Sequence, residues 1–372
     1  MTYLFVFFSS SISAHIVQHS RSKYKKIFWA FICVILPAVF LGGLRSSTLG
    51  TDNYVYYSRM FDRYHDADSI FNLPSNSTIS EVYYEPLFAL LMYLVTRFTD
   101  DYHWFCFFTV LIQMIIILKA LLYFKDDVSV GFSLLAYYLM FFCPLINIIR
   151  QGMAMAVCLY SLRYCFEKDI KRFMLCIAAA MCFHVTAIVF SLAYFITLYK
   201  NTKHQNKKIA WIIVGIILVY VLSPYIGKFL LDSGILRSHY AQYIPTTITF
   251  KFSQFLYRIP LVMLMGLFLN KLARKNPKWY SIFLFLIVDI VLSQVAGVLG
   301  GAVRIAYYFG ILAVICYSGI CRLFYARNNR LIVYSLALVY LLLYWLYWTV
   351  FNNLAFNMPV FPYVSDVIEW LF

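Results

Sequence analysis

Residues 102–124, YHWFCFFTVLIQMIIILKALLYF, and residues 129–146, SVGFSLLAYYLMFFCPLI, flank a short link that carries Lys125, Asp126 and Asp127. Each apolar run is long enough for a helix to cross the roughly 30 Å hydrocarbon core of a bilayer. Similar runs recur along the chain, and together they predict an all-α polytopic membrane protein. The predicted spans are 3–17, 27–44, 102–124, 129–146, 148–165, 209–230, 253–272, 279–299, 302–320 and 331–351.

The composition of the 372 residues agrees with this class and excludes an ordinary soluble enzyme. Hydrophobic residues make up 63% of the chain and charged residues 13%, against about 45–50% and about 25% in soluble domains. The net charge of +15 does not indicate nucleic-acid binding, because lysine and arginine collect in the cytoplasmic loops of membrane proteins. The nine cysteines are an odd number and lie mostly inside apolar runs, which argues against a disulfide framework, and no CxxC pair indicates a metal site.

Two unusual stretches determine the predicted topology. Residues 85–98 are apolar for only about a dozen positions, which is short for a crossing and fits a surface or re-entrant helix. Residues 172–199 are too long for one untilted crossing, and they predict a helical hairpin that turns near His184. Placing the Lys- and Arg-rich loops in the cytoplasm then gives about 12 membrane-crossing segments, with both termini outside.

This topology predicts one transmembrane domain over residues 1–372, with two sizeable external loops. The first loop spans 45–101 and includes the helix 85–98, and the second spans 231–252. The chain contains neither a GxxxxGK[ST] phosphate loop nor an HExxH zinc motif. We therefore expect no ATP-driven chemistry, no bound metal and no cofactor.

The ionisable residues outside the basic loops concentrate at the external ends of the spans. They are Arg45, Asp52, Glu81, Glu85, Arg97, Arg150, His184, Arg237, His239, Arg258 and Arg304. Ionisable groups at membrane depth are costly and often mark a substrate path, so the set predicts a shared external cavity. For any single arginine the alternative is that its side chain extends to the headgroup phosphates.

Two arginines lie in segments suited to a phosphate or diphosphate. Asn147-Ile148-Ile149-Arg150-Gln151 occupies an external turn where a helix N-terminus offers N–H groups, and a guanidinium matches phosphate oxygens in pairs. A capped turn with an interfacial arginine would explain the same residues. Arg304 follows Gly300 and Gly301 and is followed by Tyr307 and Tyr308, although close helix packing alone would account for the glycines.

Asp52, Glu85 and His184 are the candidate proton acceptors. Carboxylates beside several cations suit the activation of a hydroxyl while the cations hold an anionic leaving group. Each residue also has a structural alternative. Asp52 can cap the turn before Tyr54, Glu85 can cap the helix that starts at Pro86, and His184 can be a polar contact where a helix breaks. These observations leave open which of the three is the base.

Five short segments occur in an order and spacing that we recognise. They are Gly43-Leu44-Arg45, Gly50-Thr51-Asp52-Asn53-Tyr54, Glu85-Pro86-Leu87-Phe88, Asn147-x-x-Arg150-Gln151-x-x-Ala154 and Phe183-His184-x-Thr186-Ala187. Together they resemble the EpsG-like branch of the Wzy-type polysaccharide (O-antigen) polymerases. The resemblance covers roughly residues 27–200; beyond them it rests on hydropathy and on Arg304 with its tyrosines. Thr186 stands where the family pattern has serine, and the hydroxyl is kept.

The resemblance implies a GT-C-like bundle with short external surface helices in the bacterial inner (cytoplasmic) membrane, with its active site facing the periplasm. It implies an inverting glycosyltransferase that polymerises undecaprenyl-diphosphate-linked repeat units into O-antigen, capsule or exopolysaccharide. A flippase and a chain-length regulator would be its protein partners, and no nucleic acid is expected. Sugar identity, linkage and oligomeric state do not follow from the resemblance.

The resemblance and the charge pattern together assign roles to particular residues. Asp52, His184 or Glu85 would accept the proton of the attacking hydroxyl. The diphosphate would be bound by Arg45, Arg150, Gln151, Arg258, Arg304 and Tyr307, and the glycan by Asn147, Arg237 and His239.

Two other functions fit part of the pattern. A lipid-linked oligosaccharide flippase or transporter would also need many crossings and a basic cavity, but the chain shows no internal repeat and only Asp289 as an acid deep within a span. A polysaccharide O-acyltransferase would also need a histidine and several arginines. It would need the histidine within reach of a cytoplasmic acyl donor, whereas the predicted topology places His184 outside.

Overall fold

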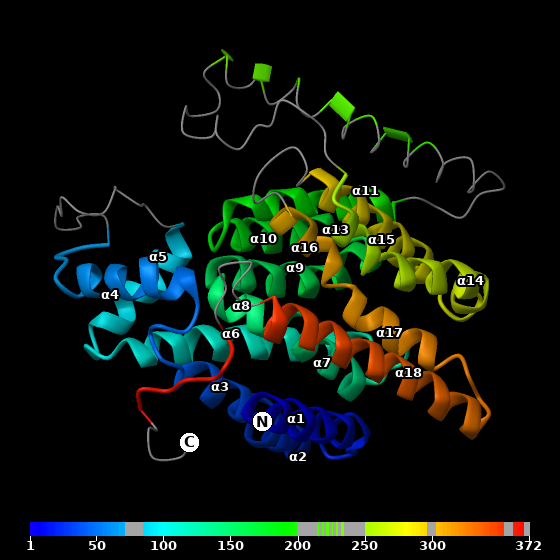
Figure 1. Ribbon diagram of the computed structural model, residues 1–372, viewed down its shortest axis with the longest axis horizontal. Helices are drawn as coiled ribbons and strands as arrows, with labels where there is room; N and C mark the ends of the chain where they lie inside the picture. Colours follow the sequence, from blue (N-terminus) through cyan, green and yellow to red (C-terminus); the bar gives the residue numbers. More distant parts are fainter. Residues whose placement is uncertain are drawn as a thin grey trace.

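The computed structural model describes residues 1–70, 85–198, 250–295, 303–352 and 360–367, with scattered helical positions between 211 and 233. Every element assigned in these ranges is a helix (Figure 1). Within the described residues, six helical runs are long and apolar enough to cross a membrane: Lys23–Gly43, Tyr102–Tyr123, Val130–Asn147, Phe252–Lys275, Val303–Cys321 and Arg327–Phe351. The all-α membrane class is confirmed, whereas the total of about 12 crossings stays a prediction.

The helices begin and end close to the predicted span limits. The α-helices are α1 (Thr2–His19), α2 (Lys23–Trp29), α3 (Leu36–Gly43), α4 (Ser58–His65), α5 (Pro86–Thr96), α6 (Tyr102–Tyr123), α7 (Val130–Tyr137), α8 (Cys143–Asn147), α9 (Ile149–Glu167), α10 (Ile170–Met181), α11 (Leu192–Thr197), α13 (Phe252–Leu256), α14 (Ile259–Lys275), α15 (Lys278–Val295), α16 (Val303–Gly310), α17 (Ala313–Cys321) and α18 (Arg327–Trp345). In the described ranges, four π-helical segments continue or join them: η1 (Ala30–Ile35), η2 (Asn53–Tyr57), η3 (Tyr138–Phe142) and η6 (Leu346–Phe351).

The helical hairpin predicted over 172–199 is present, whereas the crossing of the membrane by each of its two arms stays a prediction. Helix α10 ends at Met181, and the chain then returns through a 3₁₀ helix, η4 (Val185–Ser191), and α11. The hydroxyl of Tyr194 on α11 donates to the carbonyl of Lys168 just before α10, at 3.3 Å. The same tyrosine stacks on Phe173, with the ring centroids 5.5 Å apart. The far end of the second arm thus lies beside the start of the first, and the turn falls at His184.

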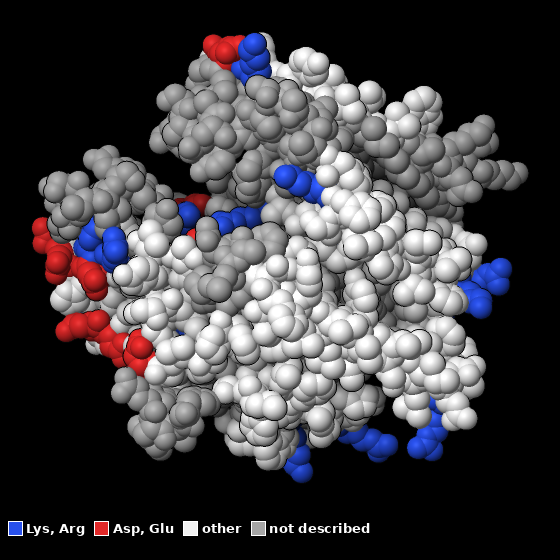
Figure 2. All heavy atoms as spheres, in the orientation of Figure 1, with Lys and Arg blue, Asp and Glu red and all other residues white. Residues whose placement is uncertain are grey.

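The basic loops that the structure describes meet at one end of the bundle, which we call the basic end. Lys278 Nζ donates to the hydroxyl of Tyr123 at 2.9 Å, and Lys275 Nζ lies 3.5 Å from the carbonyl oxygen of Arg322. These contacts bring together the ends of α6, α14 and α17 and the start of α15. In the orientation of Figure 1, Figure 2 shows lysine and arginine side chains at the right-hand and lower margins, and most of the visible acidic side chains at the left, where further basic side chains lie beside them.

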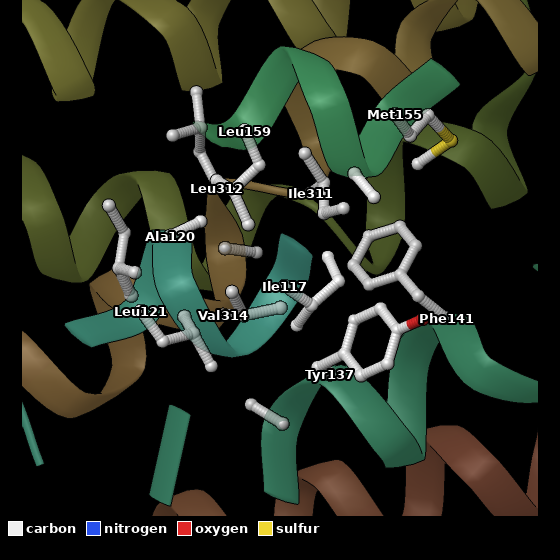
Figure 3. Close-up of a cluster of buried hydrophobic side chains, with 14 of the residues drawn as sticks. Ile117, Ala120, Leu121, Tyr137, Phe141, Met155, Leu159, Ile311, Leu312 and Val314 are labelled. Atoms are coloured by element: carbon white, nitrogen blue, oxygen red, sulfur yellow. The ribbon is translucent and has the colours of Figure 1, made fainter. Parts of the chain in front are cut away.

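The core lies where α6, α7, α9 and the break between α16 and α17 pack together. Ile117, Tyr137, Leu159, Ile311 and Val314 are buried there, and Figure 3 shows their side chains converging from these separate elements. Their burial fixes the relative positions of the helices whose opposite ends carry the polar residues described below.

Gly319 on α17 faces the buried ring of Trp279 on α15. A Cβ atom at Gly319 would lie 2.2 Å from Cη2 of that ring. We therefore expect Gly319→Ala to lower the free energy of unfolding by about 1–3 kcal/mol, as overpacking of a core does. Denaturant unfolding of the purified protein in detergent measures this.

Gly266 in α14 supplies the matched control for Gly319. A Cβ atom there would meet Phe283 at 3.8 Å, an ordinary van der Waals distance. Gly266→Ala should leave stability unchanged or raise it, because alanine favours a helix over glycine by about 1 kcal/mol. Equal effects of the two substitutions would show that the Trp279 ring does not lie against Gly319 as described.

Candidate functional site

Most of the predicted site residues meet at the end of the bundle opposite the basic end. We call the following set the polar cluster: Asp52, Glu85, Asn147, Arg150, Gln151, His184 and Arg304. It forms where the start of α5, the α8–α9 junction, the α10–η4 turn and the start of α16 come together (Figure 1). Figure 2 shows basic and acidic atoms next to one another inside a recess on this face.

Glu85 connects a cation and a histidine within this cluster. Arg150 Nη1 donates to Glu85 Oε2 at 2.7 Å, and His184 Nδ1 lies 2.9 Å from Glu85 Oε1. The backbone N–H of Val185 also donates to Oε1, at 3.2 Å. The Glu85 side chain is only 14% exposed, so a largely desolvated carboxylate holds both partners in place.

The local sequence explains why Glu85 is available for these contacts. It precedes Pro86, and a residue before proline favours extended backbone; Glu85 has φ −61° and ψ 148°. It stands at the N-cap position of α5, yet its side chain makes no capping hydrogen bond. The side chain of Glu85 therefore does not act as a helix cap, which was the structural explanation considered for this residue.

The ionisation of Glu85 determines the tautomer of its histidine partner. Burial by itself raises the pKa of Glu85, but the hydrogen bond with His184 and the charge and hydrogen bond of Arg150 outweigh burial and lower it to about 2. An ionised carboxylate only accepts hydrogen bonds, so Nδ1 of a neutral His184 must carry the proton. Nε2 of His184 is then the basic nitrogen.

The low pKa of Glu85 makes stability depend on pH. Because the folded-state value of about 2 lies below the ordinary 4.5, the carboxylate stabilises the fold fully above about pH 5, and this stabilisation is lost as the pH falls from about 5 toward 2. The contribution is about 3 kcal/mol. Unfolding curves in detergent across this pH range should show the stability gap between the native protein and Glu85→Gln shrinking on acidification. A gap that stays constant down to about pH 3 would contradict this assignment.

Asp52 and Arg304 form the second half of the polar cluster. Arg304 Nη1 lies 3.6 Å from Asp52 Oδ2, and the Arg304 side chain is 42% exposed. Gln151 donates from Nε2 to the carbonyl oxygen of Arg304. Burial raises the pKa of Asp52, while the charges of Arg304 and Arg150 oppose that rise. Asp52 makes no side-chain capping bond, so its turn-capping alternative is not what the structure shows.

Asn147 holds the loop that carries Asp52. Its Oδ1 accepts a hydrogen bond from the backbone N–H of Asp52 at 3.0 Å. Gly50 passes directly over this amide with φ +96°, and a Cβ atom there would lie 2.6 Å from Oδ1 of Asn147. Asn147 is fully buried, so the described contacts give it a role in holding the loop. Its predicted contact with glycan stays a prediction.

Three residues that the sequence did not assign also belong to this region. Tyr57 hydrogen-bonds to the side chain of Arg150. Thr186 Oγ1 lies 3.0 Å from the hydroxyl of the buried Tyr308. The tyrosine of α16 that faces the hairpin turn is thus Tyr308, whereas Tyr307 packs against Phe141. The pairing of Thr186 with a residue 122 positions away has no sequence signal.

Among the described residues, three predicted ligands of the diphosphate are not brought into the cluster: Arg45, Arg258 and Tyr307. Arg45 is fully buried and donates to the carbonyl oxygens of Gly42 and Ile146. Arg258 Nε lies 2.9 Å from Asp289 Oδ2, and both side chains are under 10% exposed. Arg237 and His239 lie outside the described residues. The guanidinium groups of Arg45 and Arg258 thus serve the packing of the bundle, and we leave them out of the site.

Comparison with known proteins adds one finding. A family model described as the EpsG family matches residues 27–365, nearly the whole chain. Neither a curated protein nor a solved structure matches. The match includes every residue of the polar cluster.

Proposed function

The chain belongs to the EpsG family, and from that premise we propose that it is a polysaccharide polymerase acting as an inverting glycosyltransferase. Its donor and acceptor would be undecaprenyl-diphosphate-linked oligosaccharide repeat units. The observation that carries the proposal is that Arg150 and His184 both contact the carboxylate of Glu85. Arg150 is a cation that can stabilise an anionic leaving group, and His184 is a base that can accept the proton of a hydroxyl.

The reaction divides between these groups. The acceptor hydroxyl attacks the anomeric carbon opposite the diphosphate and forms the new glycosidic bond, and the bond between that carbon and the diphosphate oxygen breaks. The oxygen leaves with the bonding electron pair, and the hydroxyl proton passes to Nε2 of His184. Glu85, with its low pKa, is a poor base at neutral pH and instead orients the imidazole and stabilises its charged form, as a carboxylate does in a catalytic triad.

Arg150 and Arg304 would bind the leaving diphosphate. A guanidinium has five N–H donors, so Arg150 can keep its bond to Glu85 while it donates to phosphate oxygens. Arg304 lies at a loose 3.6 Å from Asp52, and its exposed side chain suits a second contact. A hydrogen bond to a charged group contributes about 1.5–3 kcal/mol. The raised pKa of Asp52 keeps it as the alternative base.

We further propose that the polar cluster faces the outside of the bacterial inner membrane. Lysine and arginine collect on the cytoplasmic side, and the cluster lies at the end of the bundle opposite the basic end. A GT-C-like bundle with about 12 crossings would suit this arrangement, with a flippase supplying repeat units and a chain-length regulator setting product size.

A reconstituted assay tests the function. Purified protein in liposomes would receive a lipid-diphosphate-linked repeat unit, with no nucleotide sugar, ATP or acyl donor, and product length would be measured on a gel. A ladder of longer glycans supports the polymerase. Movement of the substrate between leaflets without a ladder would support the flippase instead, and a product formed only when an acyl donor is added would support the O-acyltransferase.

A further inference from the structure

A groove of about 630 Å³ opens at the basic end between α1, α7 and α18, far along the bundle from the polar cluster. We propose that this groove binds one anionic diacyl phospholipid, with its phosphate at a basic rim and an acyl chain along an apolar wall. The proposal is independent of polymer synthesis and assigns the groove a ligand of its own.

Two arginines give the rim of the groove its positive charge. Arg322 and Arg330 lie on one side, and His15 and His19 on α1 lie on the other. Arg322 is held in position because its Nη1 donates to the carbonyl oxygens of Lys125 and Val128, at 2.9 and 2.8 Å. Its remaining N–H donors extend the basic rim.

The charge of this groove distinguishes it from the neighbouring cleft. Among the described residues that line the groove, none is acidic. The cleft on the other side of Arg322 and Arg330 includes Asp126 and Asp127, together with Lys275 and Lys278. An anion is therefore attracted to the groove without the opposing carboxylates of the cleft, and basic pockets between membrane helices at the cytoplasmic side suit anionic lipid headgroups.

The wall below the rim is apolar and faces outward. Phe8 and Ile12 on α1, with Phe132 and Leu331 opposite, line it. Phe8 is seven residues from His15, so the wall extends about 10 Å along the helix from the rim. Ile12 is 61% exposed and Leu331 55% exposed. A soluble anion would leave these side chains uncovered, whereas the acyl chain of a phospholipid covers them.

A close helix contact fixes the floor of the groove. Gly131 at the start of α7 packs against α1, where a Cβ atom would lie 2.4 Å from the carbonyl oxygen of Ser11 and 2.9 Å from Cβ of His15. Any larger residue would separate the two helices and displace His15. The rim and the wall therefore belong to a formed site rather than to two independent surfaces.

Native mass spectrometry of the full chain, loaded with a mixture of phosphatidylglycerol and phosphatidylcholine, tests this proposal. We expect the native protein to retain phosphatidylglycerol preferentially. Arg330→Ala should lower its retention about fivefold, the effect of one lysine or arginine near an anionic lipid, and Arg330→Lys should restore it. Arg330 is exposed, and equal melting temperatures of the variants would show that they remain folded.

Arg327→Ala provides the matched control, because Arg327 is exposed on the same helix and does not line the groove. Retention in this variant should match that of the native protein. Equal losses in Arg327→Ala and Arg330→Ala would overturn the proposal and indicate a diffuse electrostatic attraction. Equal retention of the two lipids would overturn it as well, and so would displacement of phosphatidylglycerol by inorganic phosphate alone.

Discussion

Polymer synthesis is expected to fall about 10²–10³-fold when Arg150 is replaced by alanine, the loss that follows removal of one donor to a charge that develops in the transition state. Arg150 is bonded to Glu85 at 2.7 Å and would stabilise the departing diphosphate. Arg150→Lys should recover only part of the rate, because an ammonium cannot reproduce the planar fork of a guanidinium. Initial rates of glycan elongation in liposomes measure both variants.

Two controls separate the chemistry of Arg150 from its effect on folding. Arg163→Ala removes an arginine from the other end of α9 and should leave elongation unchanged. Removing Arg150 alone leaves the Glu85 carboxylate buried without its cation, which is destabilising. Arg150→Ala/Glu85→Gln should regain thermal stability while remaining inactive. Normal product length in Arg150→Ala would remove Arg150 from the site.

The second large effect is expected for His184→Gln, which should lower the maximal elongation rate about 10²–10⁴-fold, the usual contribution of a general base. Glutamine can still donate a hydrogen bond to Glu85 but cannot accept a proton. The affinity for the lipid-linked donor, measured by tryptophan fluorescence or calorimetry, should therefore stay close to that of the native protein.

Asp52→Asn decides between the two candidate bases. If His184 is the base, Asp52→Asn should slow elongation less than His184→Gln, because the amide still holds Arg304 through a hydrogen bond. A larger loss in Asp52→Asn, together with an active His184→Gln variant, would transfer the role of base to Asp52. Glu85→Gln should slow elongation through the histidine and weaken stability at neutral pH.

The helical spans followed closely from hydropathy. The predicted spans 102–124 and 129–146 correspond to the helical runs Tyr102–Tyr123 and Val130–Asn147. The agreement is expected because the length of an apolar run, which is a local property of the sequence, sets whether a helix can cross the hydrocarbon core. The π-helical segments, such as η3 between α7 and α8, were not predicted. They change the hydrogen-bond pattern within an apolar run and leave its composition unaltered.

The site was predictable only in part. Asp52, Glu85, Arg150, His184 and Arg304 could be selected because ionisable residues are rare near apolar spans and costly there. The residues that these side chains contact in the folded protein could not be predicted from the sequence. Tyr307 and Tyr308 are adjacent in sequence, yet successive residues of a helix point about 100° apart, so only the packing of α16 decides that Tyr308 meets Thr186.

Hydropathy and the charge pattern of the sequence predicted a bundle of membrane helices with its basic loops at one end and its candidate chemistry at the other. The free energy of transferring a segment into the bilayer and the preference of lysine and arginine for the cytoplasmic loops depend on the composition of each segment. Both can therefore be predicted from the sequence. The pairing of individual arginines became visible in the folded structure alone. Arg258 is paired with Asp289, 31 residues away on another helix, and Arg45 with backbone carbonyls. Whether a charge is available to a ligand depends on neighbours brought close by packing, and no local pattern contains that information.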